Sequence, residues 1–106
     1  RAPDVAWVKK ERIDALGEDE KMKFPNICPD FIIELKSKSD SLKLLKNNMQ
    51  EWMQNGCRLG WLIDLDEKKI YAYHNEKEFE EIDFSRKFIS GEEVLPEFQL
   101  DLSELM

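Results

Sequence analysis

Hydrophobic residues gather in short runs separated by charged stretches, and these runs predict the strands of a small α/β protein. Residues 31–36, FIIELK, are nearly continuous in apolar character. A strand with one solvent-exposed face alternates regularly between apolar and polar residues, and these residues do not. The absence of alternation is typical of a strand that is covered on both faces. Residues 58–64, RLGWLID, have the same character. Shorter or more alternating runs predict further strands at 3–8, 70–75 and 78–84.

The segment between the two apolar strands has the period of an amphipathic helix. Apolar residues recur on one helical face, at Leu42, Leu45, Met49, Trp52 and Met53. Candidate N-caps precede this face, at Ser39, Asp40 and Ser41. Gly56 is a typical helix stop. A helix in this position predicts a crossover that places strands 31–36 and 58–64 parallel in one sheet.

The remaining segments are predicted to be less regular. Residues 9–28 are charged and contain glycine and proline, so we expect a loop with one helical turn around 12–16. The C-terminal segment is predicted to form short turns around Pro96 and a final helical turn. The pattern as a whole predicts an α/β sheet of mixed strand direction, in a single domain over residues 1–106.

Composition limits the classes of protein to which the chain can belong. Its 106 residues suffice for one small core, and a hydrophobic content of 42% with 37% charged residues is that of a folded domain. No apolar run approaches the roughly 20 residues that span a bilayer, and the start has no signal-peptide core, so we expect a cytoplasmic protein with no membrane partner. Cys28 and Cys57 lack metal-ligand spacing and are expected to be free thiols.

The net charge is −7, which weighs against a broad electrostatic grip on nucleic acid. It leaves open an enzyme that holds phosphates through a metal ion at one local site.

Two charged residues stand out within the apolar strand 31–36. Glu34 and Lys36 point to the same face, with their Cα atoms roughly 6.6 Å apart. A carboxylate there can hold a divalent cation, and a lysine beside it can orient a water or stabilise charge on a phosphate. The alternative is a surface ion pair on an edge strand.

A metal site needs a second acid close in space. Asp30 shares the face of Glu34, but four residues along a strand is about 13 Å, too far for both side chains to reach one ion. Asp4 lies near the start of another strand, and neighbouring strands are about 4.8 Å apart. If the two strands pair in suitable register, Asp4 and Glu34 converge on one Mg²⁺. The alternative is a polar residue at a strand start, which is common after proline.

The resulting pattern, P-D and then, thirty residues further, E-x-K, resembles that of the PD-(D/E)xK nuclease superfamily. The sequence around this motif is more specific and resembles the Uma-two family of restriction-endonuclease-like bacterial proteins. The likeness runs from Arg1 to the C-terminus, apart from residues 9–28 and 66–90. It is carried by the segments RAPDVAWV, PDFIIELKSKSDSLKLLKNNMQEWMQNGCRLGWLID and GEEVLPEFQLDLSEL.

The resemblance implies a restriction-endonuclease-like mixed β-sheet flanked by helices, with the N-terminal elements of a longer parent domain lacking here. It implies Asp4 and Glu34 as metal-binding residues for Mg²⁺ or Mn²⁺, and Lys36 as the catalytic lysine. The implied activity is endonucleolytic hydrolysis of phosphodiester bonds in DNA. Cleavage of both strands at once would favour a homodimer.

Other readings remain beside this one. Many relatives carry a lysine in the helix at the position of Asn48, whereas this chain has its lysine on the strand. Lys43, Lys46 and Gln50 could contact substrate, or they could form a solvated helix face. The only histidine, His74, has no visible catalytic partner. The alternative function is a catalytically inactive nuclease-fold domain used for binding or assembly, and a weaker one is hydrolysis of a substrate other than DNA.

Overall fold

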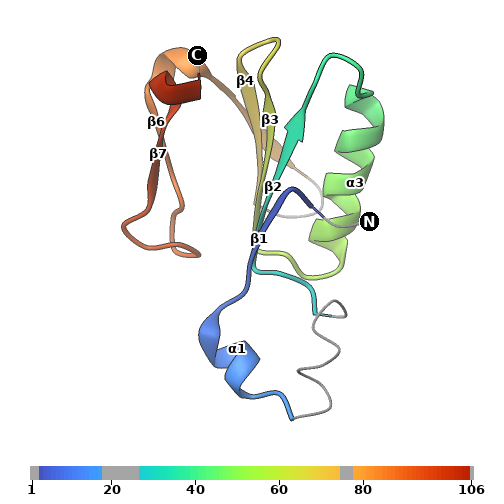
Figure 1. Ribbon diagram of the computed structural model, residues 1–106, viewed down its shortest axis with the longest axis vertical. Helices are drawn as coiled ribbons and strands as arrows, with labels where there is room; N and C mark the ends of the chain where they lie inside the picture. Colours follow the sequence, from blue (N-terminus) through green and yellow to red (C-terminus); the bar gives the residue numbers. More distant parts are fainter. Residues whose placement is uncertain (1–2, 18–26, 75–77, 106) are drawn as a thin grey trace.

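The structure is a computed structural model that describes residues 3–17, 27–74 and 78–105. Within these ranges, five strands form one sheet in the order β1-β2-β3-β4-β5 (Figure 1). β2 and β3 run parallel, and the other neighbouring pairs are antiparallel, so the predicted mixed sheet is confirmed. The strands are β1 (Val5–Trp7), β2 (Phe31–Lys36), β3 (Leu59–Asp64), β4 (Lys69–Tyr73) and β5 (Phe79–Asp83).

The sheet is covered on both faces (Figure 1). The helix α3 (Leu42–Gln54) packs on one face, where Leu45, Met49 and Met53 meet Ile32 and Leu62. On the other face, Trp61 belongs to a cluster that includes residues from the C-terminal segment. That segment forms the elements η2 (Phe84–Arg86), β6 (Phe88–Ser90), β7 (Gln99–Asp101) and η3 (Leu102–Leu105).

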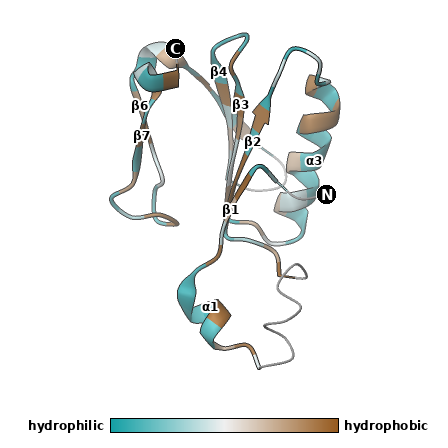
Figure 2. Ribbon diagram, in the orientation of Figure 1, coloured by the Kyte–Doolittle hydropathy of each residue, from teal (hydrophilic) through white to brown (hydrophobic). Residues whose placement is uncertain are grey.

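Successive side chains along a strand point to opposite faces of the sheet. Ile32 faces α3 and Phe31 faces the other cluster, so Glu34 and Lys36 share the α3 face with Ile32. Figure 2 shows β2 in the hydrophobic colour, which agrees with its place between two covering layers. The alternative of a surface ion pair is wrong for Glu34, which is 1% exposed. β1 pairs only with Phe31–Ile33, so Glu34 and Lys36 lie just beyond that pairing.

The helix begins and ends where its sequence predicts. Among the three candidate caps, Ser41 is the one used: the N–H of Leu44 donates to its Oγ at 3.3 Å. Asp40 instead closes the preceding turn, since its Oδ2 accepts from the N–H and the hydroxyl of Ser37, each at 2.9 Å. After the helix, Gly56 has φ 109°, a conformation that side chains disfavour.

A glycine sets the distance between α3 and the middle of the sheet. A Cβ at Gly60 would lie 2.7 Å from Cε of Met49 and 3.3 Å from Cγ1 of Ile32. Gly60 also pairs with Ile32 across β2 and β3. Met49 therefore sits at the level of Ile32 along the sheet, which fixes the height of the helix residues relative to the charged part of β2.

The C-terminal segment corrects one prediction. Instead of turns around Pro96 alone, it contains a two-stranded antiparallel sheet in which Ile89 pairs with Leu100. Ile89 is buried in the cluster around Trp61, so the pair is held by packing against the main sheet. β6 and β7 have three residues each and do not belong to a longer apolar run such as the one that predicted β1. The predicted final helical turn is present as η3.

The N-terminal loop contains one helical turn, α1 (Lys10–Asp14), which starts two residues before the predicted turn at 12–16. Two predicted segments lie partly outside the described residues. They are residues 18–26 of the loop, and residues 75–77, which fall at the end of the strand predicted at 70–75 and before the one predicted at 78–84. In the part of the chain that the structure describes, no helix has the length and apolar character needed to cross a membrane.

Candidate active site

The structure brings Asp4 and Glu34 together across the antiparallel pair β1 and β2. Val5 pairs with Ile33, and one further step in this register sets Asp4 opposite Glu34. The N–H of Asp4 donates to Oε1 of Glu34 at 3.2 Å, and the N–H of Leu35 donates to Oδ2 of Asp4 at 2.7 Å. Each carboxylate is thus held by the backbone of the other strand. Their role as metal ligands stays a prediction.

The two carboxylates differ in exposure. Glu34 is 1% exposed, whereas Asp4 lies in an exposed position at the start of β1. Burial of a carboxylate is costly unless hydrogen bonds or charges compensate it, and the N–H of Asp4 supplies one such bond. The pair therefore joins a carboxylate anchored inside the sheet to one that is open to solvent and to a substrate.

Lys36 lies two residues beyond Glu34 on the same face of β2 and is half-buried. Its Nζ donates to the carbonyl of Ser37 at 3.2 Å. The lysine that the sequence predicts to be catalytic is thus on the same face as the carboxylate pair, toward the carboxyl end of the strand.

Another buried carboxylate, that of Asp64, lies beside Lys36. Asp64 pairs with Lys36 in the parallel register of β2 and β3 and is 1% exposed. Its Oδ1 accepts the N–H groups of Asp66 and Glu67, each at 3.1 Å. We did not predict this residue as part of the site. Its signal in the sequence is an acid that ends an apolar strand directly before a turn.

Asp30 has a separate, structural role. Its Oδ2 accepts the N–H of Lys9 at 2.8 Å, and its Oδ1 pairs with the guanidinium of Arg12 at 2.9 Å. Both carboxylate oxygens are therefore engaged with the segment around α1. This agrees with the strand-distance argument that separates Asp30 from the acid of the P-D motif.

The charged residues of α3 lie on two different flanks of the helix. Nζ of Lys46 lies 4.4 Å from the centre of the Tyr71 ring and 4.9 Å from that of Phe79, so this flank faces β4 and β5. The opposite flank carries Trp52, whose carbonyl accepts from Sγ of Cys28, just before β2. Asn48 lines a depression together with Trp52 on this second flank.

The residues of α3 that are predicted to contact substrate lie on the flank that faces β4 and β5 or on the exposed helix surface. Lys43 lines a depression with Lys46 on the side of β4 and β5, and Gln50 is exposed on the helix surface. Asp4 and Glu34 lie at the other edge of the sheet. Substrate contact by Lys43, Lys46 and Gln50 stays a prediction, and it would occur away from the carboxylate pair.

The donor set at the β1–β2 edge suits a hard cation. Among the described residues, no group of three or more His, Cys, Asp or Glu side chains is placed to hold a metal ion. Mg²⁺ commonly binds through one or two carboxylates and completes its shell with waters and substrate phosphates. Two carboxylates brought together at an open edge of the sheet fit that requirement.

The model of the Uma2 family, described as "Putative restriction endonuclease", matches residues 1–103. The chain belongs to this family. It is also similar to a protein from Anabaena variabilis ATCC 29413, described as "a putative nuclease belonging to DUF820", with 29% identity and a TM-score of 0.66. The similarity covers 74% of this chain and 44% of that chain, so the Uma2 chain spans less than half of its neighbour's length. No curated protein matches the chain.

These comparisons confirm the predicted family and the predicted nuclease-like α/β fold. The match over residues 1–103 includes the carboxylate pair, Lys36 and the whole of α3. The family description and the neighbour's description both name a putative nuclease.

Proposed function

We propose that this protein is a metal-dependent endonuclease that hydrolyses phosphodiester bonds in DNA, with Mg²⁺ or Mn²⁺ as its cofactor. Asp4 and Glu34 hold the ion, and Lys36 acts beside it. The observation that carries the proposal is that each carboxylate accepts a backbone N–H from the other strand, Glu34 from Asp4 and Asp4 from Leu35. Membership of a family described as "Putative restriction endonuclease" supports the reaction class.

Backbone hydrogen bonds and burial position the two carboxylates of the proposed site. The N–H of Leu35 fixes the carboxylate of Asp4, so the orientation of that side chain is set by β2 as well as by its own rotamer. Glu34 is anchored in the sheet by burial and by the N–H of Asp4. Such fixed positions lower the cost of arranging the reacting groups.

Lys36 supplies the positive charge that the protein itself brings to the reaction. Its ammonium, on the face of Glu34, would donate to the attacking water or to a phosphate oxygen as negative charge develops there. When bound, a divalent ion would polarise the scissile phosphate and lower the pKa of the attacking water.

DNA contact in this proposal is local. With a net charge of −7, binding would depend on a few lysines rather than on a basic surface. Lys43 and Lys46, with Gln50, would contact the DNA backbone on the β4–β5 side of α3, at a distance from the cut. Cleavage of both strands would require two copies of the site, which a homodimer would supply.

Plasmid nicking tests the proposal. Supercoiled plasmid and Mg²⁺ are incubated with the wild-type protein, with Glu34→Gln and with Glu80→Gln, which changes an exposed acid on β5. The proposal expects nicking by the wild type and by Glu80→Gln, and none by Glu34→Gln. Nicking at the same rate by Glu34→Gln would refute the site. DNA binding without nicking by the wild type would instead support the non-catalytic alternative.

A further inference from the structure

A depression of about 180 Å³ lies along one flank of α3, away from the lysines of the other flank. Its lining residues recur at i, i+3, i+4 and i+7, which form a single stripe on a helix. They are Asn48, Glu51, Trp52 and Asn55. The proposed reaction gives this depression no role.

The depression faces the edge of the sheet that carries the carboxylate pair. Trp52 contacts Cys28 through its carbonyl, and Cys28 leads directly into β2. Lys46, which lies over the Tyr71 ring, marks the opposite flank. Along the helix, Asn48 precedes Met49, which packs on Gly60 at the level of Ile32. Asn48 therefore lies near the level of Ile32, two residues before Glu34 on β2.

The lining matches the chemistry of a nucleobase. An asparagine amide can donate to and accept from the edge of a base, and a carboxylate can accept from an exocyclic amine. A half-buried indole offers a surface on which a base can stack. The volume is below the roughly 300 Å³ at which sites for larger ligands begin, so it suits one planar group.

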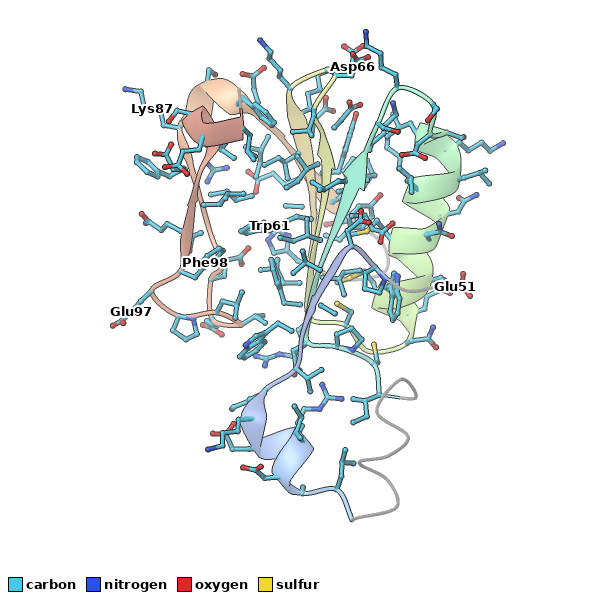
Figure 3. All side chains as sticks on the ribbon, in the orientation of Figure 1. Glu51, Trp61, Asp66, Lys87, Glu97 and Phe98 are labelled. Atoms are coloured by element: carbon cyan, nitrogen blue, oxygen red, sulfur yellow. The ribbon has the colours of Figure 1, made fainter. Side chains whose placement is uncertain are left out.

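Two residues form the outer part of the depression. The Nδ2 of Asn55 donates to the carbonyl of Glu51 at 2.9 Å, which fixes the Asn55 side chain at the end of the helix. Figure 3 shows Glu51 pointing from α3 away from the sheet. Asn48 and Trp52, both half-buried, are the residues best placed to contact an inserted base.

We propose that this depression is a nucleobase subsite, in which Asn48 recognises the edge of one DNA base and Trp52 stacks on it. This inference rests on the proposed nuclease function, since the base would belong to the strand held at the carboxylate pair. The subsite would give the enzyme a preference for one base near the cut.

The chain offers a matched control. Asn47 is the same residue type, next in sequence, and it lines the depression of Lys43 and Lys46 on the other flank. Asn47→Ala and Asn48→Ala therefore remove the same amide from opposite sides of α3. Both residues are at least partly exposed, so neither change removes a buried core contact.

Binding without metal tests the subsite independently of cleavage. Single-stranded oligomers of dA, dC, dG and dT are titrated into the protein with EDTA, and tryptophan fluorescence is followed. We expect the wild type and Asn47→Ala to prefer one of the four by about tenfold, and Asn48→Ala to lose that preference. Equal binding of the four by the wild type, no binding at all, or a preference retained by Asn48→Ala would overturn the subsite.

Cleavage of a randomised oligonucleotide library separates this proposal from the proposed function. If the wild type cuts and Asn48→Ala cuts with the same base preference, the subsite fails while the nuclease stands. If nothing is cut but the metal-free preference depends on Asn48, the nuclease fails while the subsite stands.

Discussion

The two edges of the sheet carry different chemistry under the same helix. At the β1–β2 edge, the carboxylates of Glu34 and Asp4 accept backbone N–H groups from Asp4 and Leu35, respectively. At the β4–β5 edge, charged groups pair with one another or lie on aromatic rings: Lys69 pairs with Glu81 at 3.0 Å, and Lys46 lies over Tyr71. In our proposal the β1–β2 edge holds the reacting groups, whereas the β4–β5 side contributes packing and contacts to the DNA backbone.

The largest effect is expected at Lys36. Lys36→Ala should lower the nicking rate by about 10²–10³-fold, because it removes the protein's own donor to the developing charge. Measured at saturating DNA, the loss should appear in kcat. Lys38→Ala, which changes an exposed lysine two residues away, is the control and should nick at nearly the wild-type rate. Equal rates for Lys36→Ala and the wild type would remove Lys36 from the mechanism.

Asp30 tests whether a buried acid near the reactive edge is structural. Asp30→Asn should lower the free energy of unfolding by roughly 1–3 kcal/mol, because it weakens charge-assisted bonds to Arg12 and to the N–H of Lys9. Urea denaturation measures this loss. The folded fraction should still bind Mn²⁺ as the wild type does. A stable variant that has lost metal binding would show that Asp30 is a ligand.

The packing between α3 and the sheet predicts a loss of stability in alkali. Burial raises the pKa of Cys57 from 9.0 to about 12 and that of Tyr73 from 10.0 to about 12. The unfolded chain therefore loses these protons first as the pH rises. The stabilisation is fully present below about pH 9 and is lost as the pH approaches 12.

The midpoint of urea unfolding, measured between about pH 8 and 11, checks this expectation. Tyr73→Phe should reduce the decline above pH 10 because it removes one of the two titrating groups. A midpoint that stays level over this range would contradict the burial of both groups.

The smallest effect is expected at Lys46. Lys46→Ala should lower the free energy of unfolding by about 0.5–1 kcal/mol, the usual size of a partly exposed contact between a cation and aromatic rings. Its nicking rate should fall much less than that of Lys36→Ala. A loss of nicking as large as that of Lys36→Ala, in a variant that remains folded, would indicate that the β4–β5 edge takes part in the reaction.

Much of the central fold could be predicted because its signals are local and strong. β2 is a nearly continuous apolar run and α3 has a clear helical period, and a helical crossover between two apolar strands dictates the parallel pairing of β2 and β3. β6 and β7 were not predicted, since each has three residues and, unlike the equally short β1, neither stands in a longer apolar run. Their position depends on packing against Trp61, which stacks on Phe98 with ring centres 6.1 Å apart (Figure 3).

The candidate site was predictable to a similar degree. Strand spacing was enough to choose Asp4 over Asp30 as the neighbour of Glu34. The difference between the flanks of α3 was not predictable. The apolar face of a helix indicates which side meets the sheet, but the order of the strands decides what lies to either side of it. Lys46 and Asn48, two residues apart, therefore belong to different regions.

The central claim is that Asp4 and Glu34 together hold one divalent ion. Calorimetric titration of Mn²⁺ into the wild type, Asp4→Asn and Glu34→Gln tests it most directly, with circular dichroism to establish that each variant is folded. The account predicts one site in the wild type and loss of measurable binding in both variants. Wild-type affinity in either variant, or no binding by the wild type, would contradict it.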